Sequence, residues 1–207
     1  TVRRLVKTQQ SFWLKHKRTT EGWKKAEIRR FHSPRRRKEV FDLKFYEIPG
    51  LSQEHMETWF HHVLAPDSAR LSEGLIAKMQ PSFVSCHFLE GESVMAFDVL
   101  DWELNPQDMI HGGITSTGFD TALGMLCHYY AYPYTLTTVN LSTTFLAPIR
   151  LGDTMFFHSK IKSFGRSLVT VEGEVFVKST GKLAATATGT FKIMHHKVKE
   201  ERTEEQK

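Results

Sequence analysis

One long segment without a charged face most constrains what this chain can fold into. Residues 112 to 130 are expected to form a helix, and between Met109 and Ile149 the only Asp, Glu, Lys or Arg is Asp120. A helix without a charged face is stable only when most of its surface is buried. No other helix candidate of comparable length lies nearby, so the alternating segments on either side must bury this one.

Apolar and polar residues divide the expected helix into two stripes. Side chains three, four and seven positions apart on a helix share a face. One stripe is apolar and contains Ile114, Gly118, Ala122, Leu126 and Tyr129. The other is small and polar and contains Gly113, Thr117, Asp120, Thr121, Gly124 and His128. Polar groups are therefore confined to one part of a helix that is otherwise suited to burial.

Alternation with a period of two predicts the strands. Segment 83–89, a turn at Gly91 and segment 94–102 indicate a hairpin. Four more strands are expected at about 139–145, 155–161, 169–177 and 183–193. Short turns at 152–153, 165–166 and 180–182 predict that these four strands form an antiparallel meander. The expected class is α+β, with a curved antiparallel sheet of about six strands wrapped round one long central helix.

The remaining segments flank this domain. Residues 53 to 79 have the spacing of two short helices, broken at Pro66 and stopped before Pro81, which would form a lid or a packing layer. A chain of 207 residues can hold one main domain and an appendage. The expected division is a basic N-terminal extension (1–50), a short helical layer (51–80), the main domain (81–195) and a charged C-terminal tail (196–207).

Positive charge is concentrated at the beginning of the chain. Residues 1 to 38 contain fourteen Lys and Arg against Glu21 and Glu27, a net charge of +12; the whole chain carries +5, so residues 39 to 207 carry −7. Contact with nucleic acid or an anionic membrane is therefore conceivable only through this basic arm. Organellar targeting is a further interpretation of the arm. The simpler interpretation is a non-native segment that carries no function, because charge runs are usually solvated.

Further patterns bear on compartment and metals. No signal peptide is visible, and the uncharged segment 121–149 is too polar for a transmembrane segment. Cytoplasmic location is expected, with the mitochondrial matrix as the alternative if the arm is a targeting remnant. Cys86 and Cys127 form no CxxC pair. The histidine pairs 61–62 and 195–196 are adjacent in sequence, so the two side chains of each pair point to different faces of a helix or strand. No metal site is predicted.

Asp120 is the first candidate for chemistry. A carboxylate on an otherwise uncharged, buried helix must find hydrogen-bond donors, reach solvent in a cleft or have a raised pKa. Each of these conditions suits a general base or a nucleophile. The structural alternative is that Asp120 bonds hydroxyls such as that of Thr117 or caps a backbone group. Isolation alone leaves the two interpretations equal.

The loop before the helix is the second candidate. Residues 105–113 read Asn-Pro-Gln-Asp-Met-Ile-His-Gly-Gly and lead into the helix N-terminus, where the first amides have no helical acceptor. The N–H of Gly112 could therefore hold an oxyanion, and the side-chain amide of Asn105 could donate a second hydrogen bond. The alternative is a plain turn in which the glycines supply backbone freedom.

Together these motifs resemble a known family. Over residues 81–194 the sequence is similar to hotdog-fold acyl-CoA thioesterases of the phenylacetic-acid-degradation (PaaI-like) family. The matching motifs stand in the family's order: Asn105, His111-Gly112-Gly113, Asp120, Phe145-Leu146-Ala147-Pro148, Leu151-Gly152-Asp153, Gly165-Arg166, Gly181-Lys182-Leu183-Ala184-Ala185 and Gly189-Thr190-Phe191. Their order is more specific than any single motif.

The resemblance implies a thioester hydrolase that acts on acyl-CoA. It implies Asp120 as general base or nucleophile, Gly112 as oxyanion donor assisted by Asn105, and Thr138 as the residue that orients water. His111 would either polarise the carbonyl group or hold the loop. In such enzymes the site is shared across a dimer interface, with the loop from one subunit and the Asp from the other. A homodimer or homotetramer is therefore expected.

Four residues are expected to contact the substrate. Gly113, Thr117, Arg150 and Arg166 are the expected substrate-binding residues, and the two arginines could meet the phosphates of coenzyme A, although solvated surface bases are commoner. No cofactor is expected, because coenzyme A is part of the substrate. The alternative function is a non-catalytic hotdog subunit that binds acyl-CoA or serves an assembly to which the basic arm tethers it.

Overall fold

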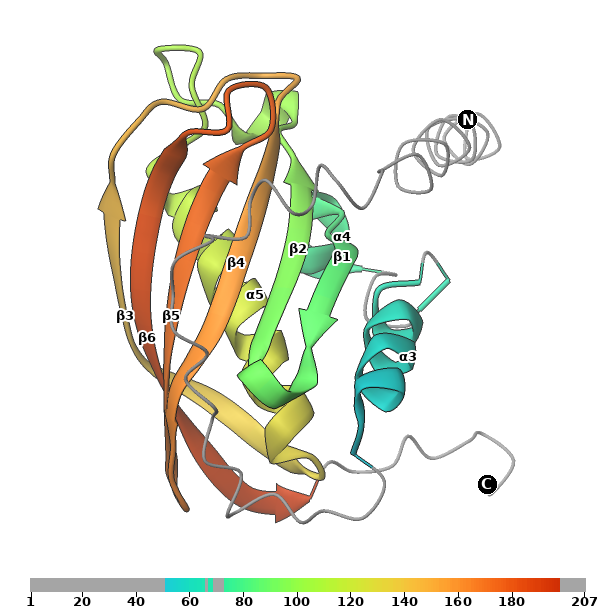
Figure 1. Ribbon diagram of the computed structural model, residues 1–207. Helices are drawn as coiled ribbons and strands as arrows, with labels where there is room; N and C mark the ends of the chain where they lie inside the picture. Colours follow the sequence, from blue (N-terminus) through green and yellow to red (C-terminus); the bar gives the residue numbers. More distant parts are fainter. Residues whose placement is uncertain (1–50, 66, 69–72, 198–207) are drawn as a thin grey trace, which may run out of the picture. The chain divides into compact units, whose positions relative to one another are not determined.

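The computed structural model describes residues 51–65, 67–68 and 73–197 (Figure 1). The expected basic extension (1–50) and the expected tail from residue 198 onward lie outside the described residues, as do Ala69 and Leu71 of the second expected N-terminal helix. The described part contains a six-stranded sheet, the long helix α5 and two shorter α-helices.

Six antiparallel strands form one curved sheet around α5 (Figure 1). The strands are β1 (Ser82–His87), β2 (Glu92–Asp98), β3 (Tyr134–Phe145), β4 (Thr154–Phe164), β5 (Leu168–Val177) and β6 (Leu183–Lys197). Helix α5 covers Gly112–Ala131, one residue more than the sequence predicts. The α+β architecture of about six strands and one long central helix is confirmed.

The position of β3 differs from the expected four-stranded meander. The strand order is β1-β2-β4-β5-β6-β3, so β4, β5 and β6 form a meander, whereas β3 pairs with β6 at an edge of the sheet. The cause is segment 146–153, which is too long for a tight turn and crosses the end of the sheet. On the way the Ile149 carbonyl accepts the Ile110 N–H at 2.9 Å. This crossing places β4 beside β2.

Strand β2 is shorter than the alternation predicts. It ends at Asp98, and the segment up to Trp102 turns into the short helix η3 (Asp101–Glu103). Asp98 is the last residue of β2 that pairs with β4, and its carboxylate accepts the hydroxyl of its partner Thr154 at 2.6 Å. Beyond it the Leu100 N–H donates to the Glu103 carboxylate at 3.0 Å instead of to a neighbouring strand, so the chain turns.

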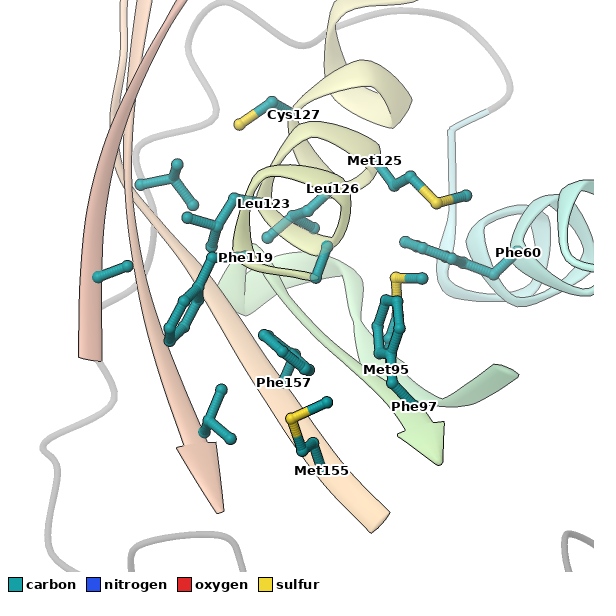
Figure 2. Packing of buried hydrophobic residues seen from close by; sticks show 14 of the residues in the cluster. Phe60, Met95, Phe97, Phe119, Leu123, Met125, Leu126, Cys127, Met155 and Phe157 are labelled. Carbon is teal, nitrogen blue, oxygen red and sulfur yellow. The ribbon is translucent and has the colours of Figure 1, made fainter. Parts of the chain in front are cut away.

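The inner face of the sheet and one side of α5 form the core (Figure 2). Phe157 of β4 contacts Phe97 of β2 and Phe119 of α5 edge-on, with ring centroids 4.8 and 5.0 Å apart. The apolar stripe expected on α5 is buried except for the half-buried Ile114, and the polar stripe stays partly accessible except for buried Thr121. Other fully buried residues of this core are Met95, Leu123, Leu126 and Met155.

Two short helices precede the sheet, α3 (Gln53–Val63) and α4 (Gly74–Met79), and η2 (Phe88–Glu90) joins β1 to β2. The α3 helix buries Met56, Phe60 and Val63. At its start the Gln53 side chain bonds the end of β1: Nε2 donates to the Cys86 carbonyl at 2.9 Å, and Oε1 accepts the Phe88 N–H at 2.8 Å. These contacts make α3 a packing layer over β1 and η2.

Candidate active site

The loop in front of α5 is a small closed hairpin. At its base the His111 N–H donates to the Glu103 carbonyl at 2.8 Å. Near its tip the Asn105 N–H donates to the Met109 carbonyl at 2.7 Å. These two bonds fix the path of the backbone that leads into Gly112, the first residue of the helix.

His111 is the N-cap of α5, and its ring bonds the first turn of the helix. The ring Nδ1 accepts the Gly113 N–H at 2.9 Å, so this nitrogen is unprotonated and the neutral ring carries its proton on Nε2. The His111 carbonyl accepts the N–H groups of Ile114 and Thr115 at 2.9 and 3.2 Å. Of its two expected roles, the structure contains the contact that would hold the loop against the helix.

Gly112 has a backbone N–H without an acceptor among the described residues. The next three amides of the helix all bond His111, so the Gly112 amide is the one left at the helix N-terminus, where negative charge is favoured. Space above it is limited, because a Cβ at Gly112 would lie 3.1 Å from Cζ of Phe145. A small planar group such as a thioester carbonyl can accept this N–H.

The Asn105 side chain shapes the tip of the loop. Its Oδ1 accepts the N–H groups of Gln107 at 2.9 Å and Met109 at 3.3 Å. The Nδ2 amino group has no acceptor among the described residues, so it can donate to a bound group. This amino group is the second oxyanion donor that the sequence predicts, and it shares the loop with Gly112.

Asp120 lies on the accessible side of α5 and bonds the edge strand β3. The Thr138 hydroxyl donates to Asp120 Oδ1 at 2.8 Å, the carboxylate is half-buried and Thr138 is exposed. Thr117, the partner considered in the structural alternative, donates its hydroxyl to the Gly113 carbonyl at 2.9 Å instead. The carboxylate therefore has a hydrogen-bond donor and access to solvent, which are two of the conditions expected for an isolated acid.

The candidate residues form two groups that are far apart within one chain. Gly112 and Asp120 are eight positions apart on α5, which corresponds to about 12 Å along the axis at about 1.5 Å per residue. An oxyanion donor and a general base for one carbonyl group must each lie within about 3 Å of the atoms that they serve. One chain therefore does not bring Asp120 and Thr138 to the same carbonyl group as Gly112.

The expected substrate-binding residues are divided in the same way. Gly113 and Thr117 lie on the first turns of α5, and their polar groups are engaged in the bonds described above. Arg150 is exposed and forms an isolated bridge with Met109, beside the loop. Arg166 is exposed in the β4–β5 turn, at the opposite end of the sheet.

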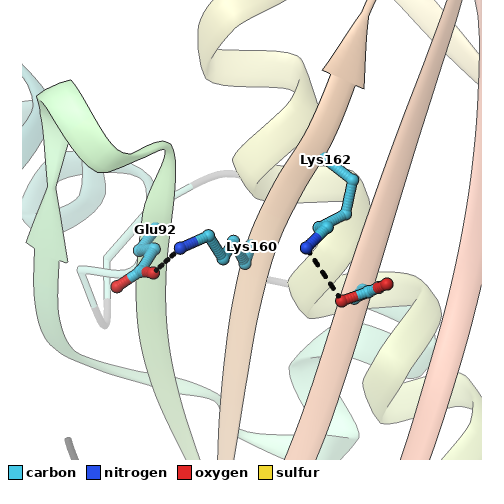
Figure 3. Close-up of polar contacts among 4 residues, drawn as sticks. Glu92, Lys160 and Lys162 are labelled. Carbon is cyan, nitrogen blue, oxygen red and sulfur yellow. Dashed lines mark ion pairs between the residues drawn. The ribbon is translucent and has the colours of Figure 1, made fainter. Parts of the chain in front are cut away.

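Two lysines of β4 are paired with carboxylates on the outer face of the sheet (Figure 3). Lys160 Nζ lies 2.8 Å from Glu92, and Lys162 Nζ lies 3.5 Å from Glu172. Both side chains project from the face opposite α5. They are therefore separated from the loop and from Asp120.

Glu103 is a residue of the loop base that sequence reasoning missed. It is the only charged side chain that is buried in the described part of the chain, with 2% exposed. Burial raises the pKa of its carboxyl group, the N–H of Leu100 counteracts this effect, and the charge of Asp98 adds to the rise. From the sequence, a Glu next to Asp101 and Trp102 is expected to lie in solvent. The one signal that could have indicated its role is the spacing Leu100-x-x-Glu103, which resembles that of a capping box.

The described ranges contain neither a low-pKa thiol nor a cluster of potential metal ligands. Burial raises the pKa of the Cys86 thiol to about 12 and raises that of Cys127 as well, so both thiols are protonated near neutral pH. No three His, Cys, Asp or Glu side chains of these ranges gather as potential metal ligands. None of their helices combines the length and apolar character needed to cross a membrane.

Part of the described domain matches a known protein family. Residues 107–184 match the family model of the thioesterase superfamily, a segment that includes Gly112, Asp120 and Thr138. The matched segment covers less than half of the chain, so what the family model establishes is a similarity of this part of the domain to the superfamily. No curated protein sequence matches the chain.

Solved structures agree with the fold of this hotdog domain. The PaaI protein of E. coli, from the phenylacetic acid degradation operon, is 20% identical, and the match covers 70% of this chain and 99% of that protein with a TM-score of 0.59. Zebrafish thioesterase superfamily member 2 is 18% identical over 70% of this chain and 99% of its own, with a TM-score of 0.55. A phenylacetic acid degradation-related protein of Ralstonia eutropha is 23% identical over 65% and 98%, with a TM-score of 0.55.

Proposed function

We propose that the hotdog domain hydrolyses acyl-CoA thioesters to free acid and coenzyme A. The observation that carries the proposal is the Asp120 carboxylate, which is accessible, is the only charge on α5 and accepts the Thr138 hydroxyl at 2.8 Å. A carboxylate held in this way, in a domain similar to the thioesterase superfamily, can activate water or attack the thioester carbonyl itself.

Two routes are compatible with this geometry. In the first, Asp120 takes a proton from a water whose oxygen attacks the carbonyl carbon, and Thr138 accepts the other proton of that water in a hydrogen bond. In the second, a carboxylate oxygen attacks and water then hydrolyses the resulting anhydride. In both routes the C–S bond breaks, and the coenzyme A thiolate leaves and takes up a proton.

The loop supplies the other half of the chemistry. The Gly112 N–H and the Asn105 amino group are both without acceptors in the described residues and would donate to the oxyanion. A proton on Nε2 of His111 would let that ring polarise the same carbonyl group, although its Nδ1 already holds the loop. Arg150 beside the loop, and Arg166 of a neighbouring copy, are the proposed contacts for coenzyme A phosphates.

The proposed enzyme is at least a homodimer. About 12 Å along α5 separate Gly112 from Asp120, so the complete site needs the loop of one copy and Asp120 of another. The unpaired edge strand β3 exposes Val139 and Phe145, 57% and 54% accessible, and an edge of this kind invites pairing with a second copy. Pairing there would also cover these apolar side chains.

A non-catalytic acyl-CoA-binding or assembly role is the competing proposal. The basic arm is the feature that would support tethering, and it lies outside the described residues. An acyl-binding subunit needs neither a carboxylate beside Thr138 nor a helix amide without an acceptor. These two features favour hydrolysis.

A panel of coenzyme A esters tests the proposal. Acetyl, phenylacetyl and palmitoyl esters are incubated with the wild-type chain and with Asp120→Asn, and release of the thiol is followed spectrophotometrically. We expect at least one ester to be hydrolysed by the wild type and much more slowly by the variant. Equal rates for the two proteins with every ester would contradict the proposed role of Asp120.

A further inference from the structure

The buried carboxyl group of Glu103 stands at the base of the loop that carries Gly112. Only 2% of the residue is exposed, and one hydrogen bond to its side chain is present among the described residues, from the Leu100 N–H to Oε2 at 3.0 Å. Taking a carboxylate out of water opposes folding unless its oxygens are well bonded. A side chain of this kind at the loop base calls for a role that a smaller or apolar residue would not fill.

Glu103 connects the turn η3 to the start of α5 through both its side chain and its backbone. Its N–H donates to the Leu100 carbonyl at 3.0 Å, and its carboxylate accepts the Leu100 N–H, so the two residues close the turn from both sides. The Glu103 carbonyl in turn accepts the N–H of His111 at 2.8 Å. His111 is the N-cap of α5 and precedes Gly112 directly.

We propose that Glu103 is a positioning residue that fixes the direction of the Gly112 N–H. Its side chain sets the turn, the turn sets the Glu103 carbonyl, and that carbonyl holds the N-cap from which the Gly112 amide projects. The inference rests on the proposed function, because it assigns Gly112 as oxyanion donor. A misplacement of about 1 Å at such a donor can lower turnover by about 100-fold.

Two substitutions separate the hydrogen bond of Glu103 from its charge. Glu103→Gln keeps an acceptor oxygen at the same reach and removes the charge, whereas Glu103→Leu removes both. Glu172→Leu is the matched control, because it also replaces a carboxylate by leucine but on the outer face of the sheet, where Glu172 pairs with Lys162. For each variant kcat and KM are measured on the best ester of the panel, together with hydrogen exchange at the His111 amide.

We expect Glu103→Leu to lower kcat by roughly 10- to 100-fold with KM changed by less than about threefold, since a misdirected oxyanion donor mainly affects the transition state. Exchange at the His111 amide should rise in the same variant, because its acceptor carbonyl is no longer held. Glu103→Gln and Glu172→Leu should keep both quantities near the wild-type values.

Several outcomes would overturn the inference. A folded Glu103→Leu protein with wild-type kcat and wild-type exchange at His111 would do so, as would a Glu103→Gln protein that loses as much activity as the leucine variant. If Glu103→Leu does not fold, Glu103→Asp takes its place in the test, because its side chain is one methylene shorter and does not reach the Leu100 N–H. Wild-type hydrogen exchange at the His111 amide of Glu103→Asp would then refute the inference. Hydrogen exchange at the His111 amide tests the role of Glu103 even if no ester is hydrolysed. Failure of the proposed function can therefore be distinguished from failure of this inference.

Discussion

Adding a methyl group at Gly118 should destabilise the domain, whereas the same change at Gly124, on the same helix, should stabilise it. A Cβ at Gly118 would lie 2.9 Å from Cε1 of Phe157 and closer still to Cζ. Phe157 is fully buried between Phe97 and Phe119, so its ring has no room to retreat. A Cβ at Gly124 would meet Phe191 at 3.4 Å, which is ordinary contact.

The magnitude follows from two opposing terms. Replacing Gly by Ala inside a helix gains about 1 kcal/mol at either position. Overpacking a tight core costs about 1–3 kcal/mol, and the contact distances assign this cost to Gly118→Ala alone. The helix term cancels between the variants, so Gly118→Ala should be less stable than Gly124→Ala by about 1–3 kcal/mol, or about 2–12 °C in Tm for a chain of this size.

Urea unfolding and thermal melting of the two variants and the wild type supply the comparison. Gly124→Ala should have the highest free energy of unfolding, and the m-values should agree so that the energies can be compared. Equal stability of the two variants, or greater stability of Gly118→Ala, would show that α5 does not pack on Phe157 as described. Asp120 lies two residues beyond Gly118, so the same error would displace the candidate site.

Three further predictions concern the site and the core. Asp120→Asn should lower kcat by roughly 10² to 10⁴ with KM and Tm little changed, since it removes a base or nucleophile and keeps the shape; steady-state kinetics check this, and unchanged turnover in a folded variant refutes it. Ser159→Ala should raise the free energy of unfolding by about 1 kcal/mol in urea titrations, because its buried hydroxyl has no hydrogen-bond partner among the described residues; a loss of stability would contradict this. Burial raises the pKa of the Cys86 thiol from 9.0 to about 12, so the contribution of this thiol to stability is complete below pH 9 and is lost between pH 9 and 12. The free energy of unfolding should therefore be lower at pH 10.5 than at pH 8, and equal values at the two pH values would contradict this.

Local patterns predict the strands and the helix because each pattern has a direct physical cause. Alternation places Met155, Phe157 and Ile161 on one face of β4, where the structure buries them against α5. The same alternation does not predict which strand lies beside which. The alternation of β3 is the same whether it lies beside β4 or β6, and the path of segment 146–153 over the sheet end decides between them.

The candidate site is predictable in part for the same reason. The isolation of Asp120 and the glycines after His111 are visible in the sequence, and the rise of a helix already implies that Asp120 and Gly112 are far apart. The contact between Asp120 and Thr138 depends on where β3 lies, and only the family resemblance suggests it beforehand. Glu103 is hidden, because its burial arises from the way the turn η3 folds under the loop.

The central claim is that one complete site uses Gly112 of one copy and Asp120 of another. Gly112→Pro disables the first group, because proline lacks the N–H, is tolerated at the first helical position, and follows a residue whose φ of −67° and ψ of 132° already suit it. The ring of Phe145, which would lie 3.1 Å from the new Cβ, must shift, and its 54% exposure leaves it room to do so. Asp120→Asn disables the second group. Each variant alone should be nearly inactive on the ester that the wild type hydrolyses best.

Mixing the two variants tests the claim most directly. They are unfolded together in equal amounts and refolded, and two different tags establish how many mixed dimers form. Each mixed dimer contains one site with both groups intact, and half of the dimers are mixed, so activity should recover to about one quarter of the wild-type value. Mixed dimers without recovered activity would contradict the shared site and, with it, the assignment of these two groups to one reaction.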